Sequence, residues 1–589
     1  AKVASYVAYV LKGLTEFSTA EHISRVNALL SGIQTSPQAS RYMLMGLGGK
    51  GLVEKIVLAD QLLSQNATHL ERSGKSVVTQ VQILAQSLKT IFMTGERELA
   101  DYSPELSKKI ARDMVGCISP FQGEVLLSNN NGNAISWLLY DAHLSTSFLT
   151  QFGDDFELAD RFRTDQSYPL WCTQHPSNLS VLFPAIARKS GLDPATSFMS
   201  ALKNNPQAAL AFFKPGRDGE FARQEYWIQN RSWAHDGFVS ILGALDVAVT
   251  SEGLRGTKEA GELTSSIIEL LANRMQNKNN DGKPLKLPTE ETDLISSLSP
   301  IAAVNIAHIM ATYMPAVDYF HDKIDNAKGQ GETLSNTEVT LTKEDIFSPA
   351  ENMPQFASED LTLLIKTISS KDNGFLALRK AVDNYHSAYL DTTLQNLPVG
   401  SENRREIFET IAKADARLEG FFVSAIGGEK IERAREADAQ AKLWISLSTN
   451  LATSLLGAGE QFAVDYLADQ TLDSGNSKLE EMFASNEKLM TQTWNDIAED
   501  SLRNRKLFMI ERLFVNEILR IEDLKTYIIE DKRRSAEEVN QWFSNGEFPS
   551  VKICEDFTLR NLIFSFVKNH EKFDLDAYDA FNSEFISRF

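Results

Sequence analysis

The strongest constraint on the fold is a helix-start signal that recurs along the chain: a small polar residue followed directly by proline. Several such pairs precede apolar residues at helical spacing, among them Ser103-Pro104, Asp193-Pro194, Asn205-Pro206 and Ser299-Pro300. The polar side chain satisfies an exposed backbone N–H, and proline suits the first helical position because no hydrogen bond is lost there. Each pair therefore predicts the start of an α-helix.

Capping boxes extend this pattern to both ends of the chain. In this motif a serine and a glutamate three residues later each satisfy a backbone N–H of the other; it occurs at Ser18/Glu21, Ser477/Glu480 and Ser535/Glu538. We expect Gly32 to cap the C-terminus of the helix that the first box opens, and the second box to open a long apolar stripe that reaches Leu502. Because strand-like alternation is rare, we predict an all-α fold, a multi-subdomain bundle of amphipathic helices with few or no strands.

The length of the chain predicts several packed units, since 589 residues exceed what one hydrophobic core usually holds. Polar stretches rich in glycine, asparagine and proline, such as 128–133 and 276–292, mark the expected boundaries. We therefore predict four units: an N-terminal helical unit (1–127), a central helical unit (134–275), a second central helical unit (293–472) and a C-terminal long-helix unit (477–589).

The charge balance narrows the range of partners. The chain has 79 acidic residues against 59 Lys and Arg, a formal net charge of -20. Such a surface repels phosphate backbones and anionic headgroups, so we expect no nucleic-acid partner. No run of about 18 apolar residues appears, so we expect a soluble chain without a stable membrane span. Three cysteines far apart in sequence predict free thiols: Cys117, Cys172 and Cys554.

Two His-Asp pairs carry the sharpest enzymatic hypothesis: His235-Asp236 and His321-Asp322. Helical metal-dependent phosphohydrolases use a histidine, a His-Asp pair and a later aspartate to hold metal ions that activate water. The outer ligands stay open, with His143 or His175 before the first pair and Asp246 or Asp318 after it. The plainer alternative, which we favour, makes Asp236 a helix cap and His235 a packed side chain.

Other motifs match known sites only in part. The glycine cluster at 46–51 lacks the Gly-Lys-Ser/Thr ending of a phosphate loop, so it predicts a turn between helices. An EF-hand-like start at 277–282 has Pro288 where calcium binding requires glutamate. The acids Asp154, Asp155 and Asp160 suit charged helix faces better than a catalytic pair. We therefore predict no cofactor and leave the presence of a metal open.

A family resemblance adds to this reading. Residues 197–213 read SFMSALKNNPQAALAFF, and WAHDGF follows at 233–238, then ILGAL at 241–245. This order resembles an uncharacterised family of large helical actinobacterial proteins associated with type VII (ESX-like, WXG-type) secretion. Stretches 46–63 and 361–390 are similar in place and pattern, so the resemblance covers about residues 40 to 460. It implies no catalytic residues, and none are carried over.

The leading hypothesis is a non-enzymatic helical scaffold or delivery module of a bacterial exported, toxin-like protein. The resemblance implies protein partners, including a small helical-hairpin secreted protein, and export by a signal-peptide-independent route, with a cytoplasmic location as the alternative. Two alternatives from other classes remain. One is the metal-dependent phosphohydrolase of the helical His-Asp type. The other is a self-assembling structural protein, because long apolar stripes suit contacts in a homo-oligomer.

Overall fold

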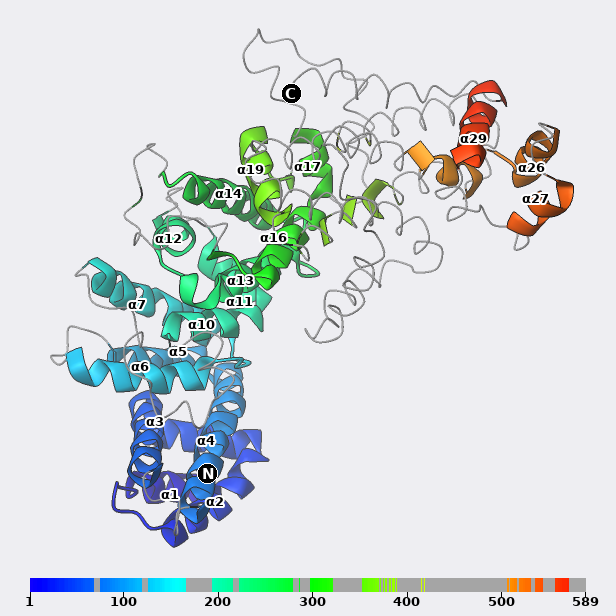
Figure 1. Cartoon of the computed structure of the whole chain (residues 1–589). Helices are drawn as coiled ribbons and strands as arrows, with labels where there is room; N and C mark the ends of the chain where they lie inside the picture. Colours follow the sequence, from blue (N-terminus) through cyan, green and yellow to red (C-terminus); the bar gives the residue numbers. More distant parts are fainter. Residues whose placement is uncertain are drawn as a thin grey trace. The chain divides into compact units, whose positions relative to one another are not determined.

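The computed structural model describes residues 1–67, 75–118, 125–165, 193–214, 222–278, 285, 297–320, 352–369, 519–530, 535–543 and 557–570, with shorter pieces between 371 and 418 and between 506 and 515 (Figure 1). The chain forms two compact units. The first comprises Ala1–Leu270 and Asn277–Ala302, and the second comprises Leu271–Gln276 and Ala303–Phe589. The division into four units stays a prediction, and each compact unit is described by itself.

Helices dominate both units. In chain order the structure has α1 (Lys2–Lys12), α2 (Ala20–Gln34), α3 (Pro37–Ala67), α4 (Lys75–Tyr102), α5 (Pro104–Gly116), α6 (Val125–Leu139), α7 (Thr146–Asp165), α10 (Pro194–Lys203), α11 (Pro206–Phe213), α12 (Ala222–Gln224), the π-helix η2 (Glu225–Asn230), the 3-10 helix η3 (Ala234–Asp236), α13 (Val239–Thr250), α14 (Lys258–Met275), α16 (Pro300–Thr312), α17 (Met314–Phe320), α19 (Ser358–Ser369), α26 (Ile521–Glu530), α27 (Ala536–Trp542) and α29 (Phe557–His570). The described residues contain no β-strand, which confirms the all-α prediction.

The polar-proline pairs mark helix starts as predicted: α5, α10, α11 and α16 each begin at the proline. The caps are visible in the side chains, since Asp193 accepts from Ala195 N and Asn205 accepts from Ala208 N. Ser535 likewise accepts from Glu538 N at the start of α27. The long stripe predicted from Ser477 to Leu502 lies outside the described residues.

Three local predictions are wrong, two of them because a neighbouring contact decides the outcome. Thr19 caps α2, since the Ser18 hydroxyl accepts from Thr15 N and closes the preceding turn. The helix passes through Gly32 to Gln34, with nothing near the glycine to stop it. Residues 128–133 lie inside α6 rather than in a linker, where the Asn131 amide donates to the Cys117 carbonyl (2.8 Å).

The glycine cluster forms a kink inside α3, in agreement with the predicted turn between helices. Gly48 adopts φ 74 and ψ 167, a backbone conformation that residues other than glycine rarely adopt. The next residue, Gly49, lies directly against α5: a Cβ there would be 2.4 Å from the Ile110 carbonyl oxygen. The kink and the missing side chain together let α3 pack closely on α5.

Two buried charged side chains of α4 tie it to its neighbours. The Glu96 carboxylate accepts from the Ser107 hydroxyl (2.6 Å) and from Ser145 N (2.8 Å), which joins α4 to α5 and to the start of α7. Burial raises the pKa of Glu96, and these hydrogen bonds oppose the rise. Lys89 donates to the Tyr140 carbonyl (2.6 Å) just after the end of α6, and burial lowers its pKa to about 8.

An aromatic column along α7 leads toward the polar site described below. Phe148, Phe152 and Phe156 follow at four-residue spacing and stack on one another, with ring centroids 5.9 and 5.4 Å apart. Phe198 of α10 packs against the column (5.4 Å from Phe152), and Phe212 of α11 packs against Phe198 (5.1 Å). Aromatic pairs in these arrangements contribute beyond their buried area, so the column anchors α10 and α11 on α7.

In the second unit, α16 and α17 meet at a sharp bend at Tyr313, just before Pro315. Among the described residues no single helix has the length and apolarity to cross a membrane, and only this pair, bent by 80°, meets the criterion jointly. Both helices bury most of their apolar side chains inside the protein. Nearby in this unit, the buried His386 pairs with Asp415 (2.6 Å).

A separate apolar core lies near the C-terminus of the second unit. It is built from helices α26, α27 and α29 together with five nearby residues: Leu507, Met509, Ile510, Leu513 and Phe514. Its centre consists of fully buried aliphatic and aromatic side chains, among them Leu513, Ile528, Val539, Ile563 and Phe566. The core is continuous across these helices, as the amphipathic pattern of each requires.

Candidate functional site

A single π-helical turn organises the polar site in the first unit. Residues 225–230 form η2, and Arg231 N donates to the Tyr226 carbonyl (2.8 Å), a bond that spans five residues. In this wider turn, side chains five apart lie on the same side, so Tyr226 and Arg231 face the same way. Both bond to Asp160 of α7: the Tyr226 hydroxyl and Arg231 Nε each donate to Oδ2 at 2.7 Å.

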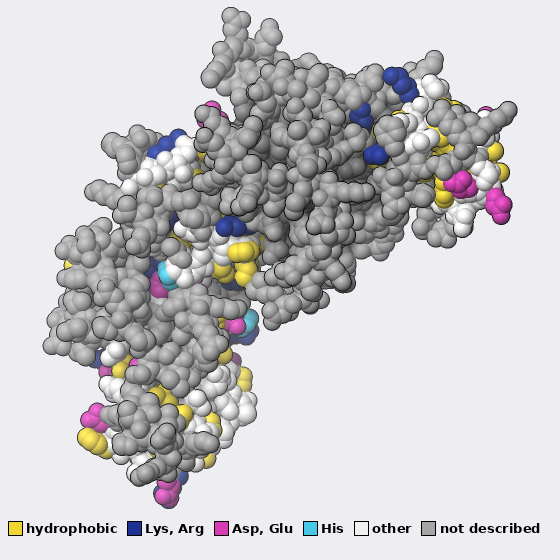
Figure 2. Space-filling model, viewed as in Figure 1, with side chains coloured by type: hydrophobic (Ala, Val, Ile, Leu, Met, Phe, Trp, Pro, Cys, Tyr) yellow, Lys and Arg dark blue, Asp and Glu magenta, His cyan; other side chains and the backbone are white. Residues whose placement is uncertain are grey.

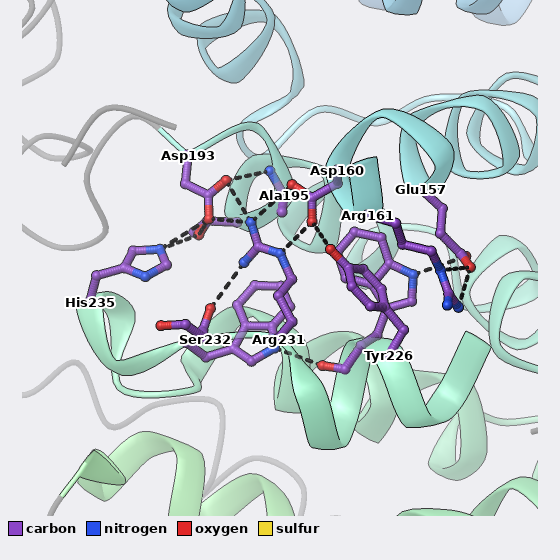
Figure 3. A network of polar contacts seen from close by, with 12 residues as sticks. Glu157, Asp160, Arg161, Asp193, Ala195, Tyr226, Arg231, Ser232 and His235 are labelled. Atoms are coloured by element: carbon purple, nitrogen blue, oxygen red, sulfur yellow. Dashed lines mark hydrogen bonds and ion pairs between the residues drawn. The ribbon is translucent and has the colours of Figure 1, made fainter. Parts of the chain in front are cut away.

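Arg231 is the centre of a buried ionic cluster (Figure 3). Its side chain is fully buried and lies between Asp160 and Asp193, with Nη2 at 2.9 Å from Asp193 Oδ2. Nη1 donates to the Ser232 carbonyl (3.1 Å), and the guanidinium stacks on the Trp233 ring at 4.5 Å. The cluster joins α7, the N-cap of α10 and the segment after η2, three parts far apart in sequence.

Electrostatics hold these groups in their charged forms. Burial acts to lower the pKa of Arg231, but Asp160 and Asp193 raise it above its usual range. Burial acts to raise the pKa of Asp193, but Arg231 and His235 hold it below its usual range. Removing one partner from such a cluster leaves an uncompensated buried charge, so the cluster couples the three segments.

His235 lies at the edge of the cluster, as Figure 3 shows. Its Nε2 is 3.2 Å from Asp193 Oδ2 and 3.0 Å from the Thr196 hydroxyl, while Nδ1 has no hydrogen-bond partner among the described residues. A nucleophile relay needs the carboxylate on one ring nitrogen and the hydroxyl on the other. Here both groups meet the same nitrogen, so His235, Asp193 and Thr196 do not form such a relay.

Asp236 caps the following helix. One carboxylate oxygen accepts from Phe238 N (3.0 Å), and the other accepts from Ser240 N (3.1 Å) at the start of α13. Burial raises the pKa of Asp236, and the bonds to Ser240 oppose the rise. Between these residues Gly237 has φ 60, and a Cβ there would lie 2.8 Å from Ser299. The WAHDGF segment is therefore a tight turn into α13.

A second set of ion pairs extends the contact between α7 and the η2 region. The Glu157 carboxylate accepts from Arg161 Nε (2.8 Å), Arg223 Nε (2.6 Å) and the indole of Trp227 (3.1 Å). Arg223 also pairs with Asp154 (2.8 Å). The three acids considered as a catalytic pair therefore have separate partners: Asp154 and Asp160 each pair with an arginine, and Asp155 accepts from the Gln151 amide (3.0 Å).

The structure describes only some of the remaining sequence candidates. His321 and Asp322 lie outside the described residues, as does His175. Asp318, a candidate outer ligand, lies 4.0 Å from His386. Burial acts to lower the pKa of His386, but Asp415 and Asp318 raise it to about 9. Among the residues that the structure describes, no three His, Cys, Asp or Glu side chains are arranged to hold a metal.

The cap assignment of Asp236 gives a direct test. Asp236→Ala is expected to destabilise the start of α13 by about 1 kcal/mol, because Phe238 N and Ser240 N lose the carboxylate that accepts from them. Hydrogen exchange of peptides from 239–250 measures the change. Elemental analysis of the purified variant should give the same metal content as the wild-type chain. A fall in bound metal on this substitution would instead favour the phosphohydrolase hypothesis.

Sequence reasoning missed the most important residue of the cluster. Arg231 stands between aromatic residues in the segment YWIQNRSW, and an arginine that is buried is almost always paired, so its aromatic neighbours were the available signal. Asp193 was identified only as a helix cap, and its second role toward Arg231 depends on tertiary structure. Of the EF-hand-like stretch that begins at residue 277, the structure describes only residues 277, 278 and 285. Leu285 N donates there to the Asn277 carbonyl (3.2 Å).

The fold and this cluster define a large all-α protein whose first unit is organised around a buried arginine. Residues 139–545 match DUF6571, a family of unknown function, and the chain belongs to that family. The match contains both the NNPQAALAFF and WAHDGF segments and the whole cluster. The match covers residues 139–545, whereas the resemblance described from the sequence covers about residues 40 to 460. No curated protein sequence and no solved structure matches the chain.

Proposed function

We propose that this protein is a non-enzymatic helical scaffold or delivery module that acts through protein–protein contacts. We extend the proposal to a bacterial protein that leaves the cell by the type VII route without a signal peptide, carrying or shielding a toxin-like or helical-hairpin partner. If it is not exported, the scaffold acts in the cytoplasm. The export part is supported by the resemblance of the NNPQAALAFF and WAHDGF segments alone.

The observation that carries the contact role is an exposed apolar face on α1. Val3, Tyr6 and Tyr9 follow at three-residue spacing and are 67%, 60% and 75% exposed. Together they present on the order of 350 Å² of side-chain surface, the size of patch that often marks an interaction site on a soluble protein. Figure 2 shows hydrophobic side chains at the surface of the part where Figure 1 draws α1 to α4.

The contacts that His235 and Asp236 make support the same proposal. His235 faces Asp193 and Thr196, and Asp236 bonds the backbone of α13. Both side chains therefore hold helices in place, which is the role of a scaffold residue rather than of a metal ligand. The family-typical segments accordingly have a structural explanation.

A photo-crosslinking residue at Tyr9 tests the contact role in cells. It is expected to give a discrete protein adduct, whereas the same residue at the exposed Glu252 is not. Adding Tyr6→Ser should reduce the adduct about tenfold, since interface tyrosines commonly contribute 1–2 kcal/mol. An adduct that survives Tyr6→Ser contradicts an α1 interface. An adduct consisting of two copies of this chain would favour the self-assembling alternative, and light scattering would confirm it.

Secretion assays test the export part separately. The full-length protein should accumulate outside cells with an active type VII system and stay inside cells in which that system is deleted. Retention in the cytosol while a known substrate is exported would refute export but leave the scaffold role standing.

A further inference from the structure

Asp193 shares its cation with a second carboxylate. One guanidinium, Arg231, faces both Asp160 and Asp193, and all three side chains are almost completely buried. A buried carboxylate is stabilised by each positive charge in contact with it, so a second positive charge beside Asp193 would hold the start of α10 more firmly.

His235 is the side chain placed to supply that charge. Its Nε2 lies 3.2 Å from Asp193 Oδ2, opposite the side on which Arg231 binds. Its side chain is 21% exposed, so it can exchange a proton with solvent while the rest of the cluster cannot. An imidazole is also the side chain whose proton equilibrium falls nearest neutral pH.

Among the described residues, the groups that face His235 come from several elements. Asp193 and Thr196 face it from the start of α10, and Asp236 is its neighbour within η3. Arg231 acts from the segment after η2 and opposes protonation, with Asp160 of α7 behind it. Two carboxylates adjoin the imidazole against one guanidinium, so the local field favours the protonated ring.

We propose that His235 is a pH-sensitive latch between the start of α10 and the 231–238 turn. When protonated, it gives Asp193 a second charged partner and holds the N-cap of α10 in place. When it loses the proton, Asp193 keeps Arg231 as its partner but loses a charged contact, and the start of α10 is held less firmly.

The direction of the pH dependence follows from the shift of this group. Burial acts to lower the pKa of His235, but the hydrogen bond and charge of Asp193 raise it above its ordinary value. The protonated latch therefore contributes its full stabilisation below the unfolded-state pKa of about 6.5. That contribution is lost as the pH rises through the higher folded-state pKa.

Hydrogen exchange of the full chain tests the latch. Wild-type protein and His235→Gln are compared at the same pH, and the ratio of their exchange rates is taken for peptides from 194–203. Intrinsic exchange rates cancel in this ratio because the peptide sequence is identical. The variant should exchange about three- to tenfold faster near pH 5.5, since hydrogen bonds to charged groups are the strong ones. The ratio should fall toward one by about pH 9.

Two further variants make the result decisive. His143→Gln, at an exposed histidine, should give a ratio near one at every pH. Asp193→Asn removes the carboxylate that favours protonation, so the added substitution His235→Gln should then have no pH-dependent effect. A ratio for His235→Gln that stays constant from acid to alkaline pH would overturn the proposal. If that variant does not fold, pH-independent protection of α10 in the wild-type chain, after correction for intrinsic rates, would overturn it equally.

Discussion

Replacing Arg231 by methionine is expected to lower the free energy of unfolding of the first compact unit by about 3–5 kcal/mol. Methionine fills a similar volume but leaves the carboxylates of Asp160 and Asp193 buried without their shared cation. It also removes the stacking of the guanidinium on Trp233. The result would be one of the largest effects of any single substitution in this unit, because few mechanisms cost more than an unpaired buried charge.

The measurement is denaturant unfolding followed by hydrogen exchange of α7 and α10 peptides, which reads the first unit separately from the second. Arg255→Met, at an exposed arginine, is the matched control and should change stability by less than about 0.5 kcal/mol. Combining Arg231→Met with Asp160→Asn should recover about 1–3 kcal/mol, since one of the two unpaired charges is removed. Strict additivity of the two substitutions would show that Arg231 and Asp160 do not interact.

Replacing Gly49 by alanine is the second substitution with a large expected effect. A Cβ at this position would lie 2.4 Å from the Ile110 carbonyl oxygen and 2.9 Å from the Asp113 Cβ. The first obstacle is backbone, so α3 and α5 must move apart, and overpacking of this kind costs about 1–3 kcal/mol or more. Thermal unfolding should show a clear fall in Tm.

Gly32→Ala is the matched substitution. Gly32 also lies in a helix, α2, but nothing is within 4 Å of its Cβ position. Alanine should therefore raise stability by about 0.5–1 kcal/mol, through helix propensity and a less flexible unfolded chain. The same chemical change thus has opposite signs at the two positions. Equal effects would show that the close approach of α3 and α5 does not determine the cost.

The contacts of the buried polar residues explain why the sequence predicted only part of the candidate site. The sequence identified Asp236 as a helix cap, and the contacts with Phe238 N and Ser240 N agree with it. It also recognised Asp193 at the start of α10. It offered no means to pair Asp193 with Arg231, 38 residues later, or Asp160 with Arg231, 71 residues later. Such pairs depend on helix packing, which single-sequence patterns do not encode.

The helix starts, by contrast, could be predicted from the sequence. Proline at the first helical position and the polar residue before it act within one turn, so Ser103, Asn205 and Ser299 marked helix starts whatever packed around them. Where a local signal met a tertiary contact, the contact prevailed. The asparagines at 129–131 would favour a loop by propensity, yet they lie in α6, where Asn131 bonds to Cys117.

The amino-acid sequence by itself therefore determined the all-α class, the helix starts and the acidic composition, because each depends on short-range chemistry or on simple sums. Only the tertiary structure decided that Gly49 is a point of close approach, that η2 widens to a π-turn and that Arg231 joins three segments. These features depend on which helix faces which. An ion pair becomes buried, and a glycine without a Cβ becomes necessary between two helices, only once the helices have packed.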